Sequence, residues 1–135
     1  QWGIRFDGNW AKTRSINQGE PQSWADQSIG KQLVYIPEYS SSVTGRLSWK
    51  RFTLLYKYNH YSERYTTSSN ESTRHTLPAY DIHNMTVGKR FAWKNGCAVE
   101  VAAKINNVFD RKYQAILWRA MPGRNYLFSV KISYK

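Results

Sequence analysis

The clearest structural signal in this chain lies in its C-terminal segment 126–134, which reads YLFSVKISY. Its large apolar side chains recur at every second residue. Because successive side chains of a strand point to opposite faces of a sheet, this period predicts a strand with one apolar face. Segment 97–106, CAVEVAAKIN, alternates in the same way. The Asn95-Gly96 pair before it suits the positive φ angles of a two-residue hairpin turn.

The same alternation recurs throughout the chain, in segments separated by turn-forming residues. It predicts six antiparallel strands joined as a simple meander, near residues 2–15, 39–49, 52–65, 80–93, 97–106 and 125–134. In segment 80–93 the apolar face carries His83, Met85 and Val87, with Lys89 as an exception. Helix signals are nearly absent. The fold class predicted is therefore all-β.

The connections between these segments alternate in length. Residues 49–52 and 93–96 form tight turns, whereas 17–38, 66–79 and 107–124 are long. Aromatic residues gather near the short turns and toward the long loops: Trp2, Trp49, Phe52, Phe91 and Trp93 at one end, and Tyr58, Tyr61, Tyr65 and Tyr126 at the other. Outer-membrane barrels have this layout and these aromatic girdles. Alternation alone fits a soluble β-sandwich or small barrel equally well.

Length and composition limit the other classes of protein. With 135 residues, the chain has room for one domain. Its mean hydropathy is −0.69, and no stretch approaches the roughly 18 apolar residues of a membrane-spanning helix. A single cysteine, Cys97, excludes an intrachain disulfide and a zinc site built from several thiolates. Aromatic residues make up 16% of the chain, which does not suit a disordered basic tail.

The sequence offers no pattern for catalysis or for a cofactor. The histidines His60, His75 and His83 lack metal-ligand spacing. There is no Gly-x-Ser-x-Gly elbow, no glycine-rich phosphate loop and no zincin motif. We therefore expect no enzyme activity and no bound cofactor or metal.

Two linked motifs in the C-terminal half are more specific. Segment 105–113 reads INNVFDRKY and is followed by MPGRNY at 121–126. Asparagine suits a strand leaving its ladder, and a Pro-Gly pair turns the chain back toward it. The aromatic residues can anchor the loop, and the arginine can satisfy several acceptors. We expect these residues to shape the structure: Asn106, Asn107, Phe109, Asp110, Tyr113, Pro122, Gly123 and Arg124.

With LPAYD at 77–81, these motifs resemble the C-terminal end of a TonB-dependent outer-membrane receptor. Upstream, GKQLVYIPEY at 30–39 and YSERY at 61–65 fit the same family in the same order. The resemblance implies a barrel of twenty-two antiparallel strands around an N-terminal plug. Residues 1–135 then form the C-terminal portion of the barrel domain, its last six strands, without the plug and with unpaired edges near residues 2–14 and 126–134.

The resemblance also implies a function and a location. The receptor captures an extracellular ligand such as a siderophore, haem or cobalamin, and imports it with energy supplied by TonB. The chain is then a multi-pass part of the outer membrane of a Gram-negative bacterium. Its expected partners are the remaining strands and plug of the receptor, outer-membrane lipid, TonB through the N-terminal part, and the small-molecule ligand.

The barrel interpretation assigns an orientation to each face of the sheet. The residues expected to face lipid are Ile4, Leu47, Leu54, Val99, Val101, Phe128, Val130 and Ile132. Those expected to face the lumen are Lys57, Glu100, Lys104 and Lys131.

The long loops are expected to form part of the extracellular mouth. Trp24, Tyr35, Trp118 and Arg119 combine large amphipathic surfaces with a fixed positive charge, which favours them as ligand contacts. The alternative is that Trp24 and Trp118 pack these loops together.

The charge of the chain favours a second hypothesis. Its 20 Lys and Arg outnumber 9 Asp and Glu, giving a formal net charge of +11. A soluble basic β-sheet module that binds nucleic acid or another polyanion has such a composition. However, the basic residues are scattered along every segment, so nucleic acid is the less favoured partner. Solubility without detergent discriminates between the two hypotheses.

Overall fold

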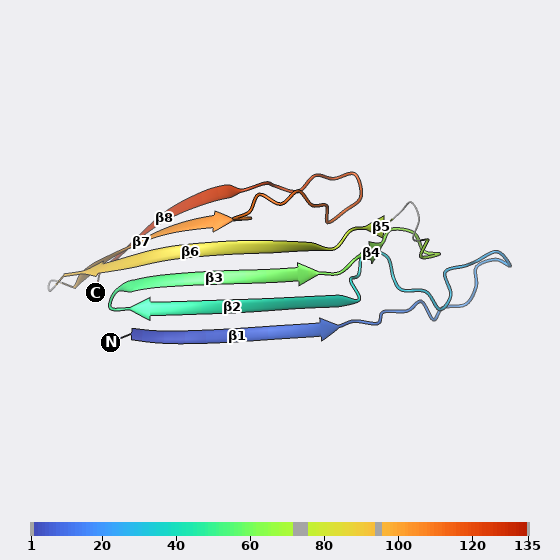
Figure 1. The fold of residues 1–135 in the computed structure, drawn as a ribbon, viewed down its shortest axis with the longest axis horizontal. Coiled ribbons are helices and arrows are strands. Elements are labelled where there is room, and N and C mark those ends of the chain that lie inside the picture. Colours follow the sequence, from blue (N-terminus) through green and yellow to red (C-terminus); the bar gives the residue numbers. More distant parts are fainter. Residues whose placement is uncertain (1, 72–75, 94–95, 135) are drawn as a thin grey trace.

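The computed structural model describes residues 2–71, 76–93 and 96–134 and shows a six-stranded antiparallel sheet (Figure 1). In sheet order, its strands are β1 (Trp2–Lys12), β2 (Tyr39–Trp49), β3 (Phe52–Tyr61), β6 (Tyr80–Ala92), β7 (Cys97–Asn106) and β8 (Asn125–Tyr134). A separate ribbon pairs β4 (Arg64–Tyr65) with β5 (Thr76–Leu77). We find no helix in the described residues, and so none long and apolar enough to cross a membrane.

The predicted all-β fold with six antiparallel strands is confirmed. The strands predicted at 39–49, 97–106 and 125–134 have those bounds in the structure, and β6 ends one residue before the predicted 93. The predicted register of segment 80–93 is also correct, since Met85 and Val87 lie level with Tyr56 and Leu54 of the apolar face.

The first strand is shorter than predicted, because it ends at Lys12 rather than at residue 15. Thr13 still donates its N–H to the Glu38 carbonyl (2.8 Å). In the same register, Arg14 would face Pro37. Beyond this point the register changes, because Ser15 accepts the N–H of Leu33 (2.7 Å) instead of that of residue 36.

The third strand was predicted to run unbroken from 52 to 65, and this is wrong. It stops at Tyr61, and the chain resumes pairing as β4. The β4–β5 pairs keep the register of β3–β6, and the interruption falls where Glu63 would face Pro78. A proline thus divides one hairpin into two ladders. Because Pro78 separates β5 from β6, the alternating pattern did not predict this short strand, which lies inside the expected loop 66–79.

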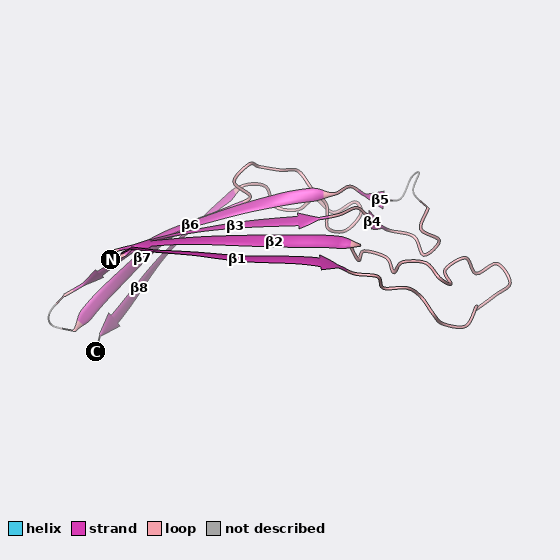
Figure 2. Cartoon of the chain, turned by 60° about the horizontal axis from the view of Figure 1, so that its bottom comes forward, coloured by secondary structure: helices cyan, strands magenta, loops and turns pink. Residues whose placement is uncertain are grey.

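The sheet is a single layer with long connections at one end (Figures 1 and 2). The short turns and both termini lie at the other end. Trp49 pairs with Phe52, so the first turn has two residues, of which Lys50 has a φ of 53°. In the second turn Gly96 has a φ of 82°. The predicted role of Asn95 falls outside the described residues.

The register places the apolar side chains on one face of the sheet. A row directly across the strands contains Ile4, Leu47, Leu54, Val87, Ala103 and Phe128. All eight residues expected to face lipid lie on this face, which we call the apolar face. The four expected to face the lumen lie on the opposite one, which we call the polar face.

The sheet leaves its apolar face largely uncovered. Phe128 is 77% exposed and Ile132 is 72% exposed. The buried apolar residues of the described chain are Leu77 and Ala98. This face therefore requires a covering that the described residues do not supply.

Candidate functional site

The first long connection, residues 13–38, begins as an extension of the β1–β2 hairpin. Leu33 donates its N–H to the Ser15 carbonyl at 2.7 Å, and Ile16 bridges to Gln32. Further along, Gly30 (φ 74°) donates its N–H to the Asn17 carbonyl at 2.9 Å. The stem of this loop is therefore fixed by backbone hydrogen bonds.

The buried side chain of Gln32 fastens this stem from within. Its Oε1 accepts the N–H of Ser15 (3.0 Å), and its Nε2 donates to the Thr13 carbonyl (3.3 Å). Its backbone makes a reciprocal pair with Asn70: the Gln32 N–H donates to Asn70 Oδ1, and Asn70 Nδ2 donates to the Gln32 carbonyl, both at 2.8 Å. These bonds join the first long loop to the second.

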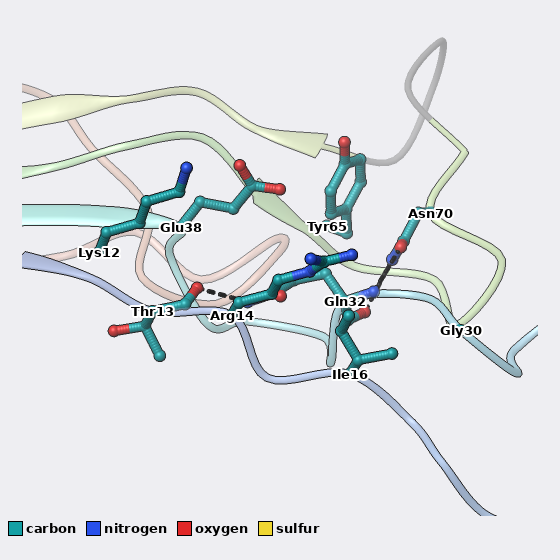
Figure 3. Close-up of a pocket in the computed structure, with 9 residues that line it drawn as sticks. All are labelled: Lys12, Thr13, Arg14, Ile16, Gly30, Gln32, Glu38, Tyr65 and Asn70. Carbon is teal, nitrogen blue, oxygen red and sulfur yellow. Dashed lines mark hydrogen bonds between the residues drawn. The ribbon is translucent and has the colours of Figure 1, made fainter.

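A cleft of about 310 Å³ lies between the two joined loops (Figure 3). Its charged lining residues are Lys12, Arg14 and Glu38, so its formal charge is positive by one. Tyr65 lines it from the ribbon, and its carbonyl accepts the N–H of Tyr35 (2.8 Å). The cleft offers charged groups and hydrogen-bonding groups to a polar ligand at the loop end of the sheet.

The third long loop, residues 107–124, is organised by Asn107. This residue is 3% exposed and has a φ of 53°, a left-handed conformation that asparagine tolerates. Its Oδ1 accepts the N–H of Arg111 and its Nδ2 donates to the Arg111 carbonyl, both at 2.9 Å. Nδ2 also reaches the Pro122 carbonyl at 3.5 Å. Asn107 thus joins the two sequence motifs.

Asp110 makes the second connection between the motifs. Its Oδ1 accepts the N–H of Arg124 at 2.7 Å. A Cβ atom added to Gly123 would lie 2.7 Å from the same oxygen, so any other residue there requires the Asp110 carboxylate to move. At the strand ends, Asn106 Nδ2 donates to Asn125 Oδ1 (2.8 Å).

The aromatic residues of the motif contact one strand, β6, on its two opposite faces. Tyr113 stacks on Tyr80 with ring centroids 4.6 Å apart, and Tyr80 contacts Tyr61 at 5.1 Å. Phe109 meets the edge of His83 at 4.7 Å, although its side chain is mostly exposed. Both contacts hold the loop against the strand ends.

Arg64 links the ribbon to the third loop and is 4% exposed. Its Nη2 donates to the Gln114 carbonyl (3.0 Å), and its guanidinium lies 4.8 Å from the centroid of the Tyr80 ring. Among the described residues its Nε has no hydrogen-bond partner. The Gln114 carbonyl and the Tyr80 ring therefore help to hold this buried cation in place.

The structure does not bring the four predicted ligand contacts together. Trp24 lies in the first loop and is 100% exposed, and Trp118 lies in the third and is 84% exposed. In both views the first loop extends away from the third (Figures 1 and 2). Arg119 follows Trp118 and is also exposed, whereas Tyr35 is tied to the ribbon. The alternative, that Trp24 and Trp118 pack these loops together, does not fit their exposure.

Sequence reasoning missed the residues that define the cleft. Gln32 and Asn70 are 38 residues apart, and no spacing rule relates a glutamine to an asparagine at that distance. For Arg64, the only signal in the sequence was its position in the YSERY segment. Such residues are recognisable only once the loops have been folded together.

His60 of β3 and His83 of β6 lie on neighbouring strands and on the apolar face. His60 Nδ1 lies 2.7 Å from Asp81 Oδ1, and His83 Nδ1 lies 2.6 Å from the Tyr56 hydroxyl. Tyr58 donates to the same Asp81 oxygen at 2.9 Å. Among the described residues we find no group of three or more side chains placed to hold a metal ion. The third histidine of the sequence, His75, falls outside the described residues.

The loop end also contains a perturbed carboxyl group. Asp26 accepts the N–H of Ser28 at 2.9 Å and that of Gln22 at 3.1 Å. Hydrogen bonds from the Ser28 side chain and from these N–H groups lower the pKa of Asp26 below its ordinary value of 3.8. The carboxylate therefore stabilises this part of the first loop.

Comparison with known proteins adds no assignment. A scan against models of protein families found none that matches the chain, and a search of curated proteins found no relative.

Proposed function

We propose that this chain forms the last six strands of the 22-stranded barrel of a TonB-dependent outer-membrane receptor. The receptor captures an extracellular small molecule, such as a siderophore, haem or cobalamin, and imports it with energy delivered through TonB. The observation that carries the proposal is a pair of parallel, oblique aromatic bands that bound the apolar face.

The two bands lie at opposite ends of the strands. At the turn end the band runs from Trp2 on β1 to Tyr134 on β8, and at the loop end from Trp10 to Tyr126. Following the register across the sheet, Trp2 is level with Val130, four residues short of Tyr134. Tyr126 is level with Phe6, four residues short of Trp10. Both bands therefore shift equally and in the same direction.

This shift gives a strand tilt. Four residues span about 14 Å along a strand, and five strand spacings span about 24 Å, so the bands cross the strands at about 30° from the perpendicular. Strands that tilt by this angle relative to a flat interface produce such bands. Outer-membrane barrel strands tilt by roughly 35–45°. A soluble sandwich needs no diagonal offset between its aromatic residues.

The height of the apolar band also suits a bilayer. Trp2 and Trp10 are eight residues apart, or about 27 Å along the strand. At a tilt of about 30° this corresponds to about 23 Å along the membrane normal, close to the roughly 25 Å apolar band of such barrels. Tyrosine and tryptophan suit both boundaries because each has an apolar ring and a polar group.

The sheet edges support a place within a larger barrel. Strands β1 and β8 each pair with one neighbour in the described chain, so each presents a row of N–H and C=O groups. Unpaired backbone groups are costly in a hydrocarbon environment. We assign these edges to the remaining strands of the same receptor, with the plug inside the barrel.

The contacts of Asn107 and Asp110 support the resemblance on which the ligand class rests. The two motifs that carry it form one hydrogen-bonded unit at the base of the third loop. Their separation in the sequence then reflects the length of the loop between them.

The arrangement of charge disfavours a nucleic-acid module. A sheet that binds single-stranded nucleic acid places stacking aromatic rings beside basic side chains. Here Trp2, Phe6 and Trp10 lie on the apolar face, whereas Arg46, Lys57 and Lys104 lie on the polar face. Most basic strand residues are therefore on the side opposite to these rings, although Lys89 lies over the Phe91 ring on the apolar face.

Cysteine labelling in intact cells tests the proposal. In the complete protein carrying Cys97→Ala, Ser23→Cys places a thiol in the first loop and Lys50→Cys places one in a short turn. We expect a membrane-impermeant maleimide to label Ser23→Cys on intact cells, and Lys50→Cys only after the outer membrane is permeabilised. Equal labelling of both, or recovery of the protein in the soluble fraction, contradicts the proposal.

A further inference from the structure

The polar face carries a surplus of positive charge. Its basic strand residues outnumber its acidic ones: Arg5, Arg46, Lys57, Arg90, Lys104 and Lys131 against Asp7 and Glu100. Within the described part of this face, the ion pair present is Arg5–Asp7. Glu100 is the backbone partner of Arg90 and Lys131, yet forms an ion pair with neither. Most of this charge is therefore not neutralised by the described chain.

Three arginines of the turn end line one cleft of about 280 Å³. Arg46 comes from β2, Arg51 from the turn between β2 and β3, and Arg90 from β6. Glu100 is the one acidic residue of the lining in the described chain, and Thr53 adds a hydroxyl group.

Hydrogen bonds hold this end of the sheet in place. Arg51 Nη1 donates to the Ala92 carbonyl at 3.1 Å. The N–H of Arg90 donates to the Arg51 carbonyl at 2.8 Å. These two bonds fix the turn against β6, so Arg51 is held beside Arg90 before any ligand binds. Such preorganisation reduces the entropy lost on binding.

We propose that this cleft binds an oxyanion, namely a carboxylate or phosphate group. A guanidinium presents paired N–H donors that match both groups, and such charge-assisted bonds are stronger than neutral ones. Lys50 and Lys89 also line the cleft, so five basic residues and one carboxylate give its described lining a net positive charge. The oxyanion is supplied either by a small solute or by the acidic side chains of another protein segment.

The site is separate from the ligand cleft of the long loops. Arg46 and Arg90 lie toward the short turns, whereas the loop cleft begins at Lys12, the last residue of β1, at the other end of the sheet. The proposal rests on the sheet and its turn, and holds whether or not the strands cross a membrane.

Titration of the purified complete protein tests this site. Inorganic pyrophosphate and a hexaglutamate peptide are added separately at constant ionic strength, and binding is measured by calorimetry. The variant Arg46→Gln/Arg90→Gln is compared with Lys57→Gln/Lys104→Gln, which removes the same charge from the same face away from the cleft. We expect saturable binding that the arginine pair weakens about tenfold or more and the lysine pair changes by less than about twofold.

The variant Glu100→Gln keeps the test independent of folding failure. Removing the acidic group of the cleft should tighten binding by about threefold, a gain that misfolding cannot produce. If Glu100→Gln binds pyrophosphate more tightly, the site is assigned to a phosphate solute. If it binds hexaglutamate more tightly, the site is assigned to acidic side chains of a protein segment. Absence of saturable binding of both probes, or equal loss in the two double variants, overturns the proposal. Because the readout is binding in solution, a failure of membrane localisation leaves this result unaffected.

Discussion

At the scale of single residues, Gly123 shows how the lack of a side chain holds a loop together. Asp110 Oδ1 occupies the space that a Cβ atom would take. We expect Gly123→Ala to push this carboxylate away from the Arg124 N–H and to destabilise the third loop by about 1–3 kcal/mol. Limited proteolysis of residues 107–124 measures the effect.

Gly8→Ala is the matched control for this substitution, because nothing lies within 4 Å of its added Cβ. Equal cleavage of the Gly123→Ala and Gly8→Ala proteins would show that the close approach to Asp110 has no structural effect.

Asp26 makes the first loop sensitive to acid. Its pKa is lowered, so its hydrogen bonds contribute stability above its ordinary pKa of 3.8 and lose it as the pH falls through the lowered value. NMR shifts of the Gln22 and Ser28 amides should therefore change below pH 3.8. Asp26→Asn should abolish this titration. The Gly19 amide, held by neutral Asn17, serves as the reference. A midpoint above 3.8 would contradict the assignment.

At the scale of strands, one proline decides where a ladder is interrupted. Pro78 faces Glu63 in the shared register and has no N–H to donate, so it separates β3–β6 from β4–β5. The period-two pattern predicts strand type and face because each residue's side follows from its position alone. It does not reveal a ladder's end, which depends on the residue opposite in the sheet.

The candidate site was less predictable than the strands. The motif 105–113 pointed to a structured third loop, and Asn107 and Asp110 organise it. The cleft depends on Gln32 contacting Asn70, and the loop link depends on Arg64 contacting Gln114. Such contacts arise from the path of the loops and have no periodic signature.

The proposed orientation of the sheet predicts a contrast between adjacent strands. Val101 lies midway between the two aromatic bands on β7, and Ser129 lies nearby on the polar face of β8. In the complete barrel, Val101→Arg should cost roughly 2–4 kcal/mol at the lipid midplane. Ser129→Arg should cost much less. Denaturant titration of barrels folded in vesicles compares the two, and similar losses for both would refute the orientation.

Lys104→Ala provides a second comparison on the polar face. Removing a charge from a water-filled lumen should leave folding nearly unchanged. A loss as large as that of Val101→Arg would show that the polar face is buried against other protein.

At the scale of the whole molecule, the uncovered apolar face predicts a requirement for detergent. The purified protein should stay monomeric in detergent micelles and aggregate when the detergent is removed, because large apolar patches associate in water. Analytical ultracentrifugation with and without detergent measures this. A monomer in plain buffer would instead favour the soluble module.

The long loops are expected to contribute to ligand capture. Trp118→Ala/Arg119→Ala and deletion of residues 20–27 should each weaken ligand binding at the cell surface, since exposed aromatic and arginine side chains often dominate binding energy. A panel of labelled ferric siderophores, haem and cyanocobalamin measures binding and uptake, with outer-membrane abundance as the control. Unchanged binding and uptake would place the mouth on other strands.

The reciprocal bonds between Gln32 and Asn70 have a practical consequence for exchanging loops between related proteins. Transplanting residues 13–38 alone would leave Asn70 facing a foreign backbone, and transplanting 62–79 alone would leave Gln32 in the same position. The two loops therefore form one structural unit, which should be transplanted as a whole or left in place.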